Sequence, residues 1–248
     1  MARQRPGTSP TPRTAERLPR RRGAPDRSNP AANRELCGMS ERALRAPGTD
    51  ERFTVRTLRL DEVDHWYRIY PVTGRSVGMG PLSFNLGWGR SRFAPIHLSG
   101  SAAHTYYAAS TLDCALLESV LHDIDLDHPS FFDLTLLKNY RVAKLRMHGS
   151  IQYVSFHSHD LPRLGLSRRQ LIEALPEDHG LTRAWAQAAL EQRAAAQAIG
   201  YTSRRNDAGR TTSSLPPFEI IDDASLGAAG RLRSNTLELI ASLGISTL

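Results

Sequence analysis

Apolar and polar residues begin to alternate at Phe53 and mark several short strands along the chain. Residues 53–58 and 66–70 alternate with the two-residue period of a half-buried strand, and Pro71 ends the second segment. Residues 105–108 have the same character. Further strand-like segments cover residues 131–136, 140–145, 200–203 and 218–221. Together these segments predict a β-sheet.

Four other segments carry apolar residues at helical spacing. Ser110 is a candidate N-cap for a helix over about residues 111–122. Ser167 and Gln170 form a capping-box pattern at the start of a second helix, which Pro176 closes. The remaining two helices are expected over residues 181–199 and 235–243.

The order of these elements indicates the fold class. Strands and helices alternate irregularly without a fixed repeat, which favours an α+β fold with a mixed or antiparallel sheet over a wound parallel sheet. Residues 72–104 are rich in Gly, Ser and Pro and predict a long irregular segment. Loops of this length in a compact domain are usually functional or mobile.

The N-terminal residues 1–50 differ in character from the rest of the chain. They hold eleven arginines and five acidic residues, so they carry all but one of the chain's net charge of +7. They also contain almost no aromatic or β-branched residues, and such a segment cannot bury enough apolar surface to fold. We expect a disordered basic leader over residues 1–50 and a nearly neutral folded domain over residues 51–248. The leader is either an arm that touches nucleic acid or anionic lipid, or an over-long start with Met39 as the true initiator, and we favour the second.

Composition excludes several classes of protein. No stretch approaches the 18 apolar residues of a membrane-spanning helix, and the N-terminus has no apolar core typical of a secretion signal. The only cysteines are Cys37, in the leader, and Cys114, so a disulfide framework is not expected and the cytoplasm is the default location.

Motifs for common cofactors are missing from the sequence, and two clusters that resemble metal sites are weak. The chain has no GxGxxG, GxxxxGK[ST], HExxH or CxxC motif. Residues 122–128 alternate acids between two histidines but lack the glycine and the closing glutamate of a calcium loop. His157 and His159 have no third partner at matching spacing, and Asp160 before Pro162 is more typical of a helix cap. We therefore expect no metal.

One further set of residues needs to be weighed as a candidate site. It comprises a carboxylate, a phenol, a hydroxyl and two guanidinium groups, from Glu118, Tyr107, Ser203, Arg92 and Arg68. On the residues alone, Glu118 is expected to point to solvent, because glutamate is rarely buried unless it is paired. The alternative is that it projects into a cleft.

Several blocks in order resemble the RES domain, a family named after an arginine, a glutamate and a serine. The family's first strand corresponds to Trp66–Ile69, and its arginine block to Gly89–Pro95. A tyrosine block and a glutamate block follow at Tyr106–Ser110 and Cys114–Asp123, with Glu118 eleven residues after Tyr107. Residues 164–186 resemble the family's linking region, and Gly200–Arg204 its serine block. The likeness covers about residues 53–225 and moves Glu118 from solvent to a catalytic position.

The resemblance implies a compact fold related to ADP-ribosyltransferase toxins and an activity that consumes NAD. RES toxins are neutralised by Xre-type antitoxin proteins, which block access to the cleft. Some members split NAD with phosphate into nicotinamide and ADP-ribose 1-phosphate, and others are linked to ADP-ribosylation of a protein. NAD would then be a substrate, inorganic phosphate a co-substrate, and neither membrane nor nucleic acid a direct partner.

The resemblance also implies a role for each site residue. Glu118 would stabilise the oxocarbenium character that develops on the ribose. Arg92, with Arg68 second, would hold the pyrophosphate or the attacking phosphate. Tyr107 would stack on nicotinamide or hydrogen-bond the ribose, and Ser203 would orient Glu118 or the nicotinamide ribose.

Several alternatives remain open at this stage. Arg90 competes with Arg92, and only the neighbouring Phe93 favours Arg92; Tyr106 competes with Tyr107, which the spacing to Glu118 selects. The primary hypothesis is a toxin that acts as an NAD phosphorylase or glycohydrolase. The others are a protein ADP-ribosyltransferase on the same fold, a nucleic-acid-binding protein that uses the basic arm, and a degenerate member that only binds partners. The acceptor, the antitoxin and the oligomeric state are left undetermined.

Overall fold

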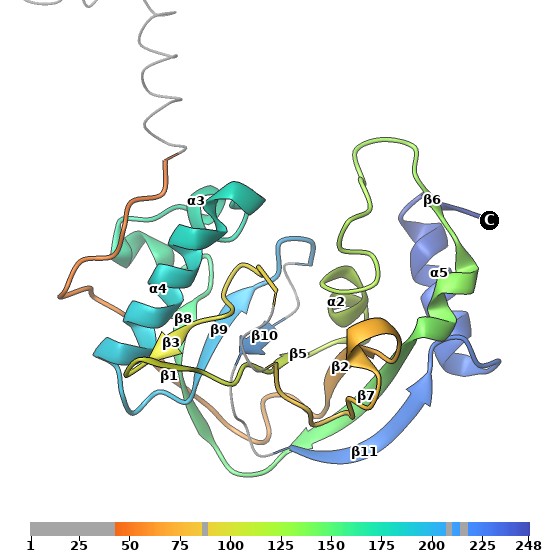
Figure 1. Ribbon diagram of the computed structural model, residues 1–248, viewed down its shortest axis with the longest axis horizontal. Coiled ribbons are helices and arrows are strands. Elements are labelled where there is room, and N and C mark those ends of the chain that lie inside the picture. Colours follow the sequence, from red (N-terminus) through yellow and green to blue (C-terminus); the bar gives the residue numbers. More distant parts are fainter. Residues whose placement is uncertain (1–42, 86–88, 207–209, 214–217) are drawn as a thin grey trace, which may run out of the picture. The chain divides into compact units, whose positions relative to one another are not determined.

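An eight-stranded sheet forms the centre of the protein in the computed structural model (Figure 1). The structure describes residues 43–85, 89–206, 210–213 and 218–248. Residues 1–42, which make up most of the expected leader, lie outside this described part. In spatial order the strands are β1 (Val55–Leu58), β8 (Ile151–Phe156), β9 (Ala198–Thr202), β10 (Arg210–Ser213), β5 (Tyr107–Ala109), β2 (Trp66–Pro71), β7 (Tyr140–Met147) and β11 (Phe218–Ser225).

Neighbouring strands of this sheet run antiparallel, with the exception of the parallel pair β8 and β9. Four helices flank the sheet: α2 (Leu112–Leu117), α3 (Arg168–Leu171), α4 (His179–Gln192) and α5 (Arg231–Ser242). Two short pairs of strands lie outside it, β3 (His97–Leu98) with β4 (Ser101–Ala102), and β6 (Phe131–Phe132) with β12 (Ser246–Thr247). The predicted α+β fold with an antiparallel sheet core is therefore confirmed.

The helices form two groups over different halves of the sheet. Helix α4 contacts β9 and β3, and α3 lies beside it (Figure 1). Helix α2 contacts β2, β5 and α5 over the other half. Figure 1 shows the two groups separated above the middle strands β10 and β5.

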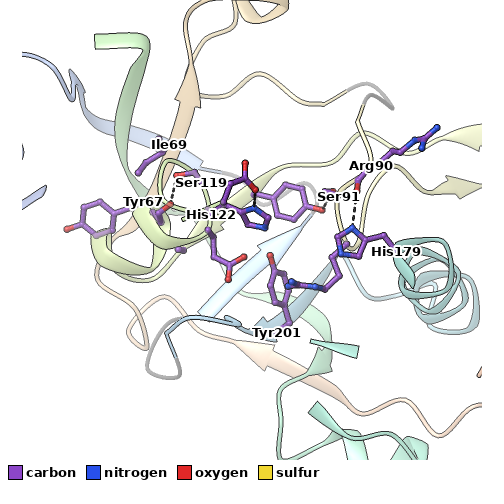
Figure 2. Close-up of a pocket in the computed structure, with 15 residues that line it drawn as sticks. Tyr67, Ile69, Arg90, Ser91, Ser119, His122, His179 and Tyr201 are labelled. Carbon is purple, nitrogen blue, oxygen red and sulfur yellow. Dashed lines mark hydrogen bonds and ion pairs between the residues drawn. The ribbon is translucent and has the colours of Figure 1, made fainter. Parts of the chain in front are cut away.

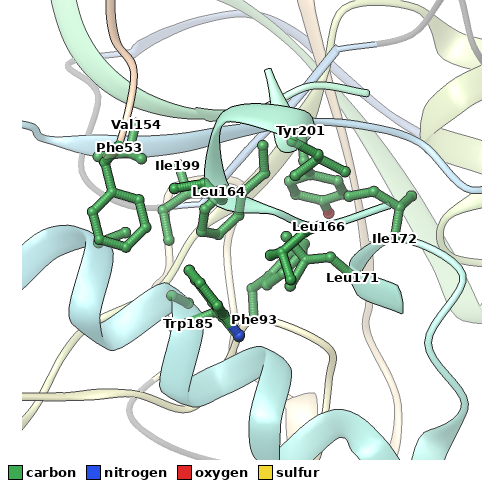
Figure 3. Packing of buried hydrophobic residues seen from close by; sticks show 14 of the residues in the cluster. Phe53, Phe93, Val154, Leu164, Leu166, Leu171, Ile172, Trp185, Ile199 and Tyr201 are labelled. Carbon is green, nitrogen blue, oxygen red and sulfur yellow. The ribbon is translucent and has the colours of Figure 1, made fainter. Parts of the chain in front are cut away.

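The two faces of the sheet bury different side chains. On β2, Trp66, Arg68 and Tyr70 are buried on one face, while Tyr67 and Ile69 are half-buried on the face that α2 covers. This alternation follows from the two-residue period of a strand. A large apolar cluster lies between α4 and the half of the sheet that this helix covers (Figure 3). The strands bury side chains on both faces of the sheet. On the helix-covered face, polar side chains can therefore line a cavity only where the helices leave the sheet uncovered.

Residues before position 51 contribute to the core around Trp185. Leu44 is 5% exposed and belongs to the same apolar cluster as Trp185. The Trp185 indole N–H donates to the carbonyl of Arg45 at 2.8 Å, and the Arg45 guanidinium lies 4.7 Å from the centre of the indole ring. The expected boundary after residue 50 is therefore too late, because residues 43–50 are part of the folded unit.

Several expected elements differ in length. The first helix is capped by Thr111 rather than Ser110, with the Thr111 hydroxyl accepting from the Cys114 N–H at 3.1 Å, and it ends at Leu117. The expected strand over residues 131–136 is a strand only at Phe131–Phe132. A 3₁₀ helix, Leu134–Asn139, follows it. Strands β8 and β10 were not expected. The capping box of Ser167 and Gln170 is confirmed.

The remaining 3₁₀ helices are short: Gly74–Ser76, Leu161–Leu164 and Pro176–Asp178. Asp160 precedes the second of these with a proline in its first turn, but its side chain makes no capping hydrogen bond and pairs with Arg56. Within the residues that the structure describes, no helix is both long enough and apolar enough to cross a bilayer.

Candidate functional site

A pocket of about 340 Å³ lies on the helix-covered face of the sheet, between the two helix groups (Figure 2). Side chains from β2, β5, β9, the end of α2 and the start of α4 reach it, together with the segment 90–92. Those with polar groups include Arg90, Ser91, Arg92, Tyr107, Glu118, Ser119, His122, Asp123 and His179. The structure therefore brings three of the residues singled out from the sequence, Arg92, Tyr107 and Glu118, to one cavity.

Glu118 is the residue that immediately follows helix α2. The helix is anchored because Cys114, Leu116 and Leu117 are buried against the sheet and α5. The carboxylate atom Oε1 of Glu118 accepts a 2.6 Å hydrogen bond from the Ser203 hydroxyl and a 3.1 Å hydrogen bond from the Arg204 N–H. In the described part of the chain, both hydrogen bonds to this carboxylate involve Oε1, so Oε2 remains for another partner.

Ser203 is fully buried just beyond the end of β9. Its Oγ accepts hydrogen bonds from the N–H groups of Arg205 and Asn206, each at 3.1 Å. A hydroxyl has one proton and two lone pairs, and the two N–H groups take the lone pairs. The proton is therefore directed to Glu118, whose Oε1 accepts both this hydrogen bond and the one from the Arg204 N–H.

The strand that leads to Ser203 needs a glycine. A Cβ atom on Gly200 would lie 2.6 Å from two ring carbons of Tyr153, which is closer than any ordinary contact. The next residue, Tyr201, packs edge-on against Phe93, with 4.8 Å between the ring centres. The serine block of the sequence is thus packed directly against the arginine block.

The arginine block is held by the first turns of α4. Three consecutive carbonyl groups, those of residues 90–92, each accept a hydrogen bond from a side chain of this helix. The donors are His179 Nδ1 to the first (3.1 Å), Arg183 Nη1 to the second (3.2 Å) and Thr182 Oγ1 to the third. Because its backbone is fixed in this way, the segment presents its side chains to the pocket at defined positions.

Arg92 is the buried arginine of this block. It is 7% exposed, whereas Arg90 is exposed, although both line the pocket. Its Nε is buried and has no hydrogen-bond partner within the described residues. A buried donor without a partner costs free energy. Phe93, the neighbour that favoured Arg92 in the sequence, is fully buried.

Tyr107 reaches the pocket from strand β5. Ser91 Oγ donates to the carbonyl of Ala94 and lies 2.9 Å from the Tyr107 hydroxyl, so the tyrosine is the donor of that second hydrogen bond. Burial raises the pKa of the Tyr107 phenol to about 12, and the group is therefore neutral at physiological pH. The neighbouring Tyr106 faces the other side of the sheet, where its hydroxyl donates to the carbonyl of Pro81 at 2.7 Å.

Arg68 does not reach the pocket. It lies on the opposite face of β2, is 8% exposed, and its guanidinium stacks 4.0 Å from the centre of the Tyr106 ring. Burial lowers the pKa of this guanidinium. The expected contact between Arg68 and a phosphate in this pocket is therefore wrong. Strand alternation points the Arg68 side chain away from the face on which its neighbours Tyr67 and Ile69 line the cavity.

His179 is a pocket residue that the sequence did not reveal. Its Nδ1 must carry the proton, because the carbonyl of Arg90 can only accept. The side chain lines the pocket (Figure 2). The only sequence feature at this position is the start of a helix after Pro176, which by itself indicates no function.

The two clusters that resembled metal sites form simple pairs. His128 Nδ1 lies 2.8 Å from Asp125, and His122 Nδ1 lies 2.9 Å from Asp123 at the rim of the pocket. His157 Nδ1 lies 3.3 Å from the hydroxyl of Thr202. No group of three or more His, Cys, Asp or Glu residues is arranged to hold a metal ion among the residues described.

Comparison with models of protein families identifies the family of this chain. A family model described as the RES domain matches residues 65–216, which is more than half of the chain. The matched span contains Arg92, Tyr107, Glu118 and Ser203 and the start of α4. No curated protein matches the chain.

Proposed function

The chain belongs to the RES-domain family, and from this premise we propose that it is an enzyme that breaks the bond between nicotinamide and ribose in NAD. Membership in this family suggests an NAD-related function of the toxin type. The observation that carries the proposal is the 2.6 Å hydrogen bond from Ser203 to Glu118 at the edge of a pocket that Arg92 also lines. One carboxylate and one buried guanidinium in a shared cavity suit a positively charged sugar centre with a phosphate-bearing tail.

Glu118 supports cleavage because its carboxyl group is held at Oε1, which leaves its other oxygen for the substrate. As the bond from C1 of the ribose to the nicotinamide nitrogen breaks, its electron pair goes to the nitrogen and nicotinamide leaves as a neutral molecule. The ribose then carries oxocarbenium character. A preoriented negative charge beside C1 or the 2-hydroxyl stabilises that state more than the ground state, and this difference accelerates the reaction.

Arg92 supports recognition of the pyrophosphate. Its planar fork of N–H groups fits phosphate oxygens, and its side chain lines the pocket. Arg90, at the exposed side of the same cavity, adds positive charge at the rim. Tyr107, as a neutral phenol, offers a ring face for nicotinamide and a hydroxyl for the ribose.

For the acceptor we propose inorganic phosphate, which would attack C1 through an oxygen atom and give ADP-ribose 1-phosphate. The cationic groups of Arg90 and Arg92 at the pocket support binding of a second anion beside NAD. Water or a protein side chain would give ADP-ribose or an ADP-ribosylated protein through the same cleavage step.

The products separate these acceptors. The purified chain is incubated with NAD carrying a label in its adenylate half, with and without phosphate. Release of nicotinamide together with a labelled ADP-ribose phosphomonoester, visible as a new ³¹P resonance, is the expected result. Labelled ADP-ribose that forms independently of phosphate would indicate hydrolysis, and a labelled protein band would indicate ADP-ribosyl transfer. No release of nicotinamide under any of these conditions would contradict the proposed function.

The toxin role and its partner extend this proposal. An enzyme that consumes NAD inside a cell stops growth unless it is inhibited, and an Xre-type antitoxin that covers the pocket would inhibit it. Expression of the chain alone should deplete cellular NAD and halt growth. Co-expression of such an antitoxin should restore both. Growth arrest without NAD loss would separate the toxicity from this pocket.

A further inference from the structure

Arg168, at the start of α3 and outside the pocket lining, makes contacts that bear on Glu118. Its Nη2 donates to the carbonyl of Ser203 and to the carbonyl of Arg204, each at 3.1 Å. We propose that Arg168 is a positioning residue that holds the Glu118 carboxylate in its reactive orientation through the two peptide groups that follow β9. This inference rests on the proposed function, because it assigns to Arg168 a part in the same reaction.

The geometry of the trans peptide bond carries the contact from Arg168 to the site. In a trans peptide the C=O and the N–H point in opposite directions. The first peptide group joins Ser203 to Arg204, and its N–H donates to Glu118 Oε1 at 3.1 Å. The second joins Arg204 to Arg205, and its N–H donates to Ser203 Oγ at 3.1 Å. Arg168 therefore binds the carbonyl oxygens of these two peptide groups. Their N–H groups, on the opposite side, bind the Glu118 carboxylate and the Ser203 hydroxyl that orients it.

Arg168 is itself held in place from two directions. Its Nε donates to Glu173 Oε1 at 2.7 Å, and its Nη1 donates to Ser158 Oγ at 3.3 Å. The side chain is 26% exposed, and Arg168 lies between Ser167 and Gln170, the two residues of the capping box. The guanidinium thus links α3, the segment after β8 and the turn after β9 with one rigid plane.

An arginine suits this position better than a lysine. The planar guanidinium has five N–H donors in a fixed arrangement, and three of its nitrogens are used here. A lysine has one nitrogen and cannot reach three elements at once. The positive charge of the guanidinium beside the two carbonyl oxygens also polarises the peptide groups. This polarisation strengthens the hydrogen bonds that their N–H groups donate to Glu118 and Ser203.

The prediction is a loss of rate without a comparable loss of binding. Arg168→Gln should lower kcat for nicotinamide release by about 10- to 100-fold, since a small displacement of a catalytic group has effects of that size. The KM for NAD should stay within about threefold, because Arg168 does not line the pocket. The kcat of Arg168→Lys should fall between those of the wild type and Arg168→Gln. Arg169 is an exposed arginine on the same helix, and Arg169→Gln should behave like the wild type.

A double-mutant cycle separates positioning from a general structural role. If Arg168 acts through the Ser203–Glu118 contact, the effects of Arg168→Gln and Ser203→Ala on kcat should be far from multiplicative, with the second substitution adding less than about threefold. Effects that multiply fully, or an unchanged kcat in Arg168→Gln, would overturn the inference. Loss of function through unfolding would instead lower the thermal midpoint and the content of folded protein.

A measurement that needs no turnover keeps the inference separate from the proposed function. Amide hydrogen exchange at Arg204 and Arg205, followed by NMR, should be faster in Arg168→Gln than in wild type and unchanged in Arg169→Gln. Equal exchange in both variants would contradict the positioning role whatever the reaction is. If amide exchange is faster in Arg168→Gln as expected, but the wild type releases no nicotinamide, the result would contradict the proposed function and leave the positioning role intact.

Discussion

The hydroxyl of Ser203 donates a 2.6 Å hydrogen bond to Oε1 of Glu118, across 85 positions of sequence. This contact joins the end of β9 to the end of α2, the two elements that lie on either side of the pocket. Because Arg205 and Asn206 fill the lone pairs of the same hydroxyl, its proton has one direction to point. The carboxylate is thereby oriented before any substrate arrives.

Removal of the Ser203 hydroxyl should therefore slow the reaction. Ser203→Ala leaves the Arg204 N–H as the remaining support of Glu118, and we expect kcat for nicotinamide release to fall by about 10- to 100-fold while the KM for NAD changes little. Initial rates at several NAD concentrations measure both constants. Ser242→Ala, which removes an exposed hydroxyl on α5, is the control. A Ser203→Ala enzyme with a wild-type kcat would show that the hydrogen bond does not contribute.

The two arginines of the pocket should differ in their effect on binding. Arg92→Gln removes the buried guanidinium, and the loss of charged hydrogen bonds to phosphate, about 1.5–3 kcal/mol, should raise the KM for NAD by about 10- to 100-fold. Arg90→Gln should raise it by less than about fivefold, because that side chain is exposed to solvent. Calorimetric titration with NAD provides an independent comparison. A larger effect at Arg90 would reverse the assignment of the site arginine.

Stability should depend on pH through Asp160, which lies outside the pocket. Burial alone would raise its pKa, but hydrogen bonds from Arg56 and Ser155 lower it to about 2, against an ordinary value of 3.8. A lowered pKa in the folded state contributes stability above pH 4 that is lost as pH falls from about 4 towards 2, and two units correspond to about 2–3 kcal/mol.

Asp160→Asn should consequently lower the free energy of unfolding at pH 7 by about 2 kcal/mol. The difference from wild type should shrink as pH falls below about 4. Urea unfolding at a series of pH values measures this, with Asp61→Asn, an exposed aspartate, as the control. A difference that stays constant from pH 7 to pH 3 would show that the ion pair with Arg56 does not stabilise the fold.

The sequence predicted the elements whose pattern is local. The strands at residues 53–58, 66–70, 140–145 and 218–221 and the last helix follow from the period of their apolar residues, and the structure has strands or a helix at each place. Strand β8 was missed because five of its six residues are buried, so it shows no alternation. Strand β10, with polar residues only, carries no apolar pattern from which a strand could be inferred.

The site shows the same division between local and long-range information. The positions of Arg92, Tyr107, Glu118 and Ser203 were expected from motifs, and the structure places them at or beside one cavity. The contributions of α4 and of Arg168 could not be found in this way. They act through side-chain bonds to backbone carbonyls, and a backbone acceptor leaves no trace in the residue types. Arg68 was assigned by residue type alone, although the alternation of its own strand already separates it from Tyr67 and Ile69.

The central claim is that the carboxylate of Glu118 stabilises the breaking of the bond to nicotinamide. The most direct test is nicotinamide release by Glu118→Gln at saturating NAD, with Glu219→Gln, a surface glutamate paired with Arg146, as the control. The amide keeps an oxygen for the Ser203 hydroxyl but removes the charge, so we predict a rate at least about 100-fold below wild type with NAD affinity within about threefold. A Glu118→Gln enzyme that releases nicotinamide within twofold of the wild-type rate would contradict the account.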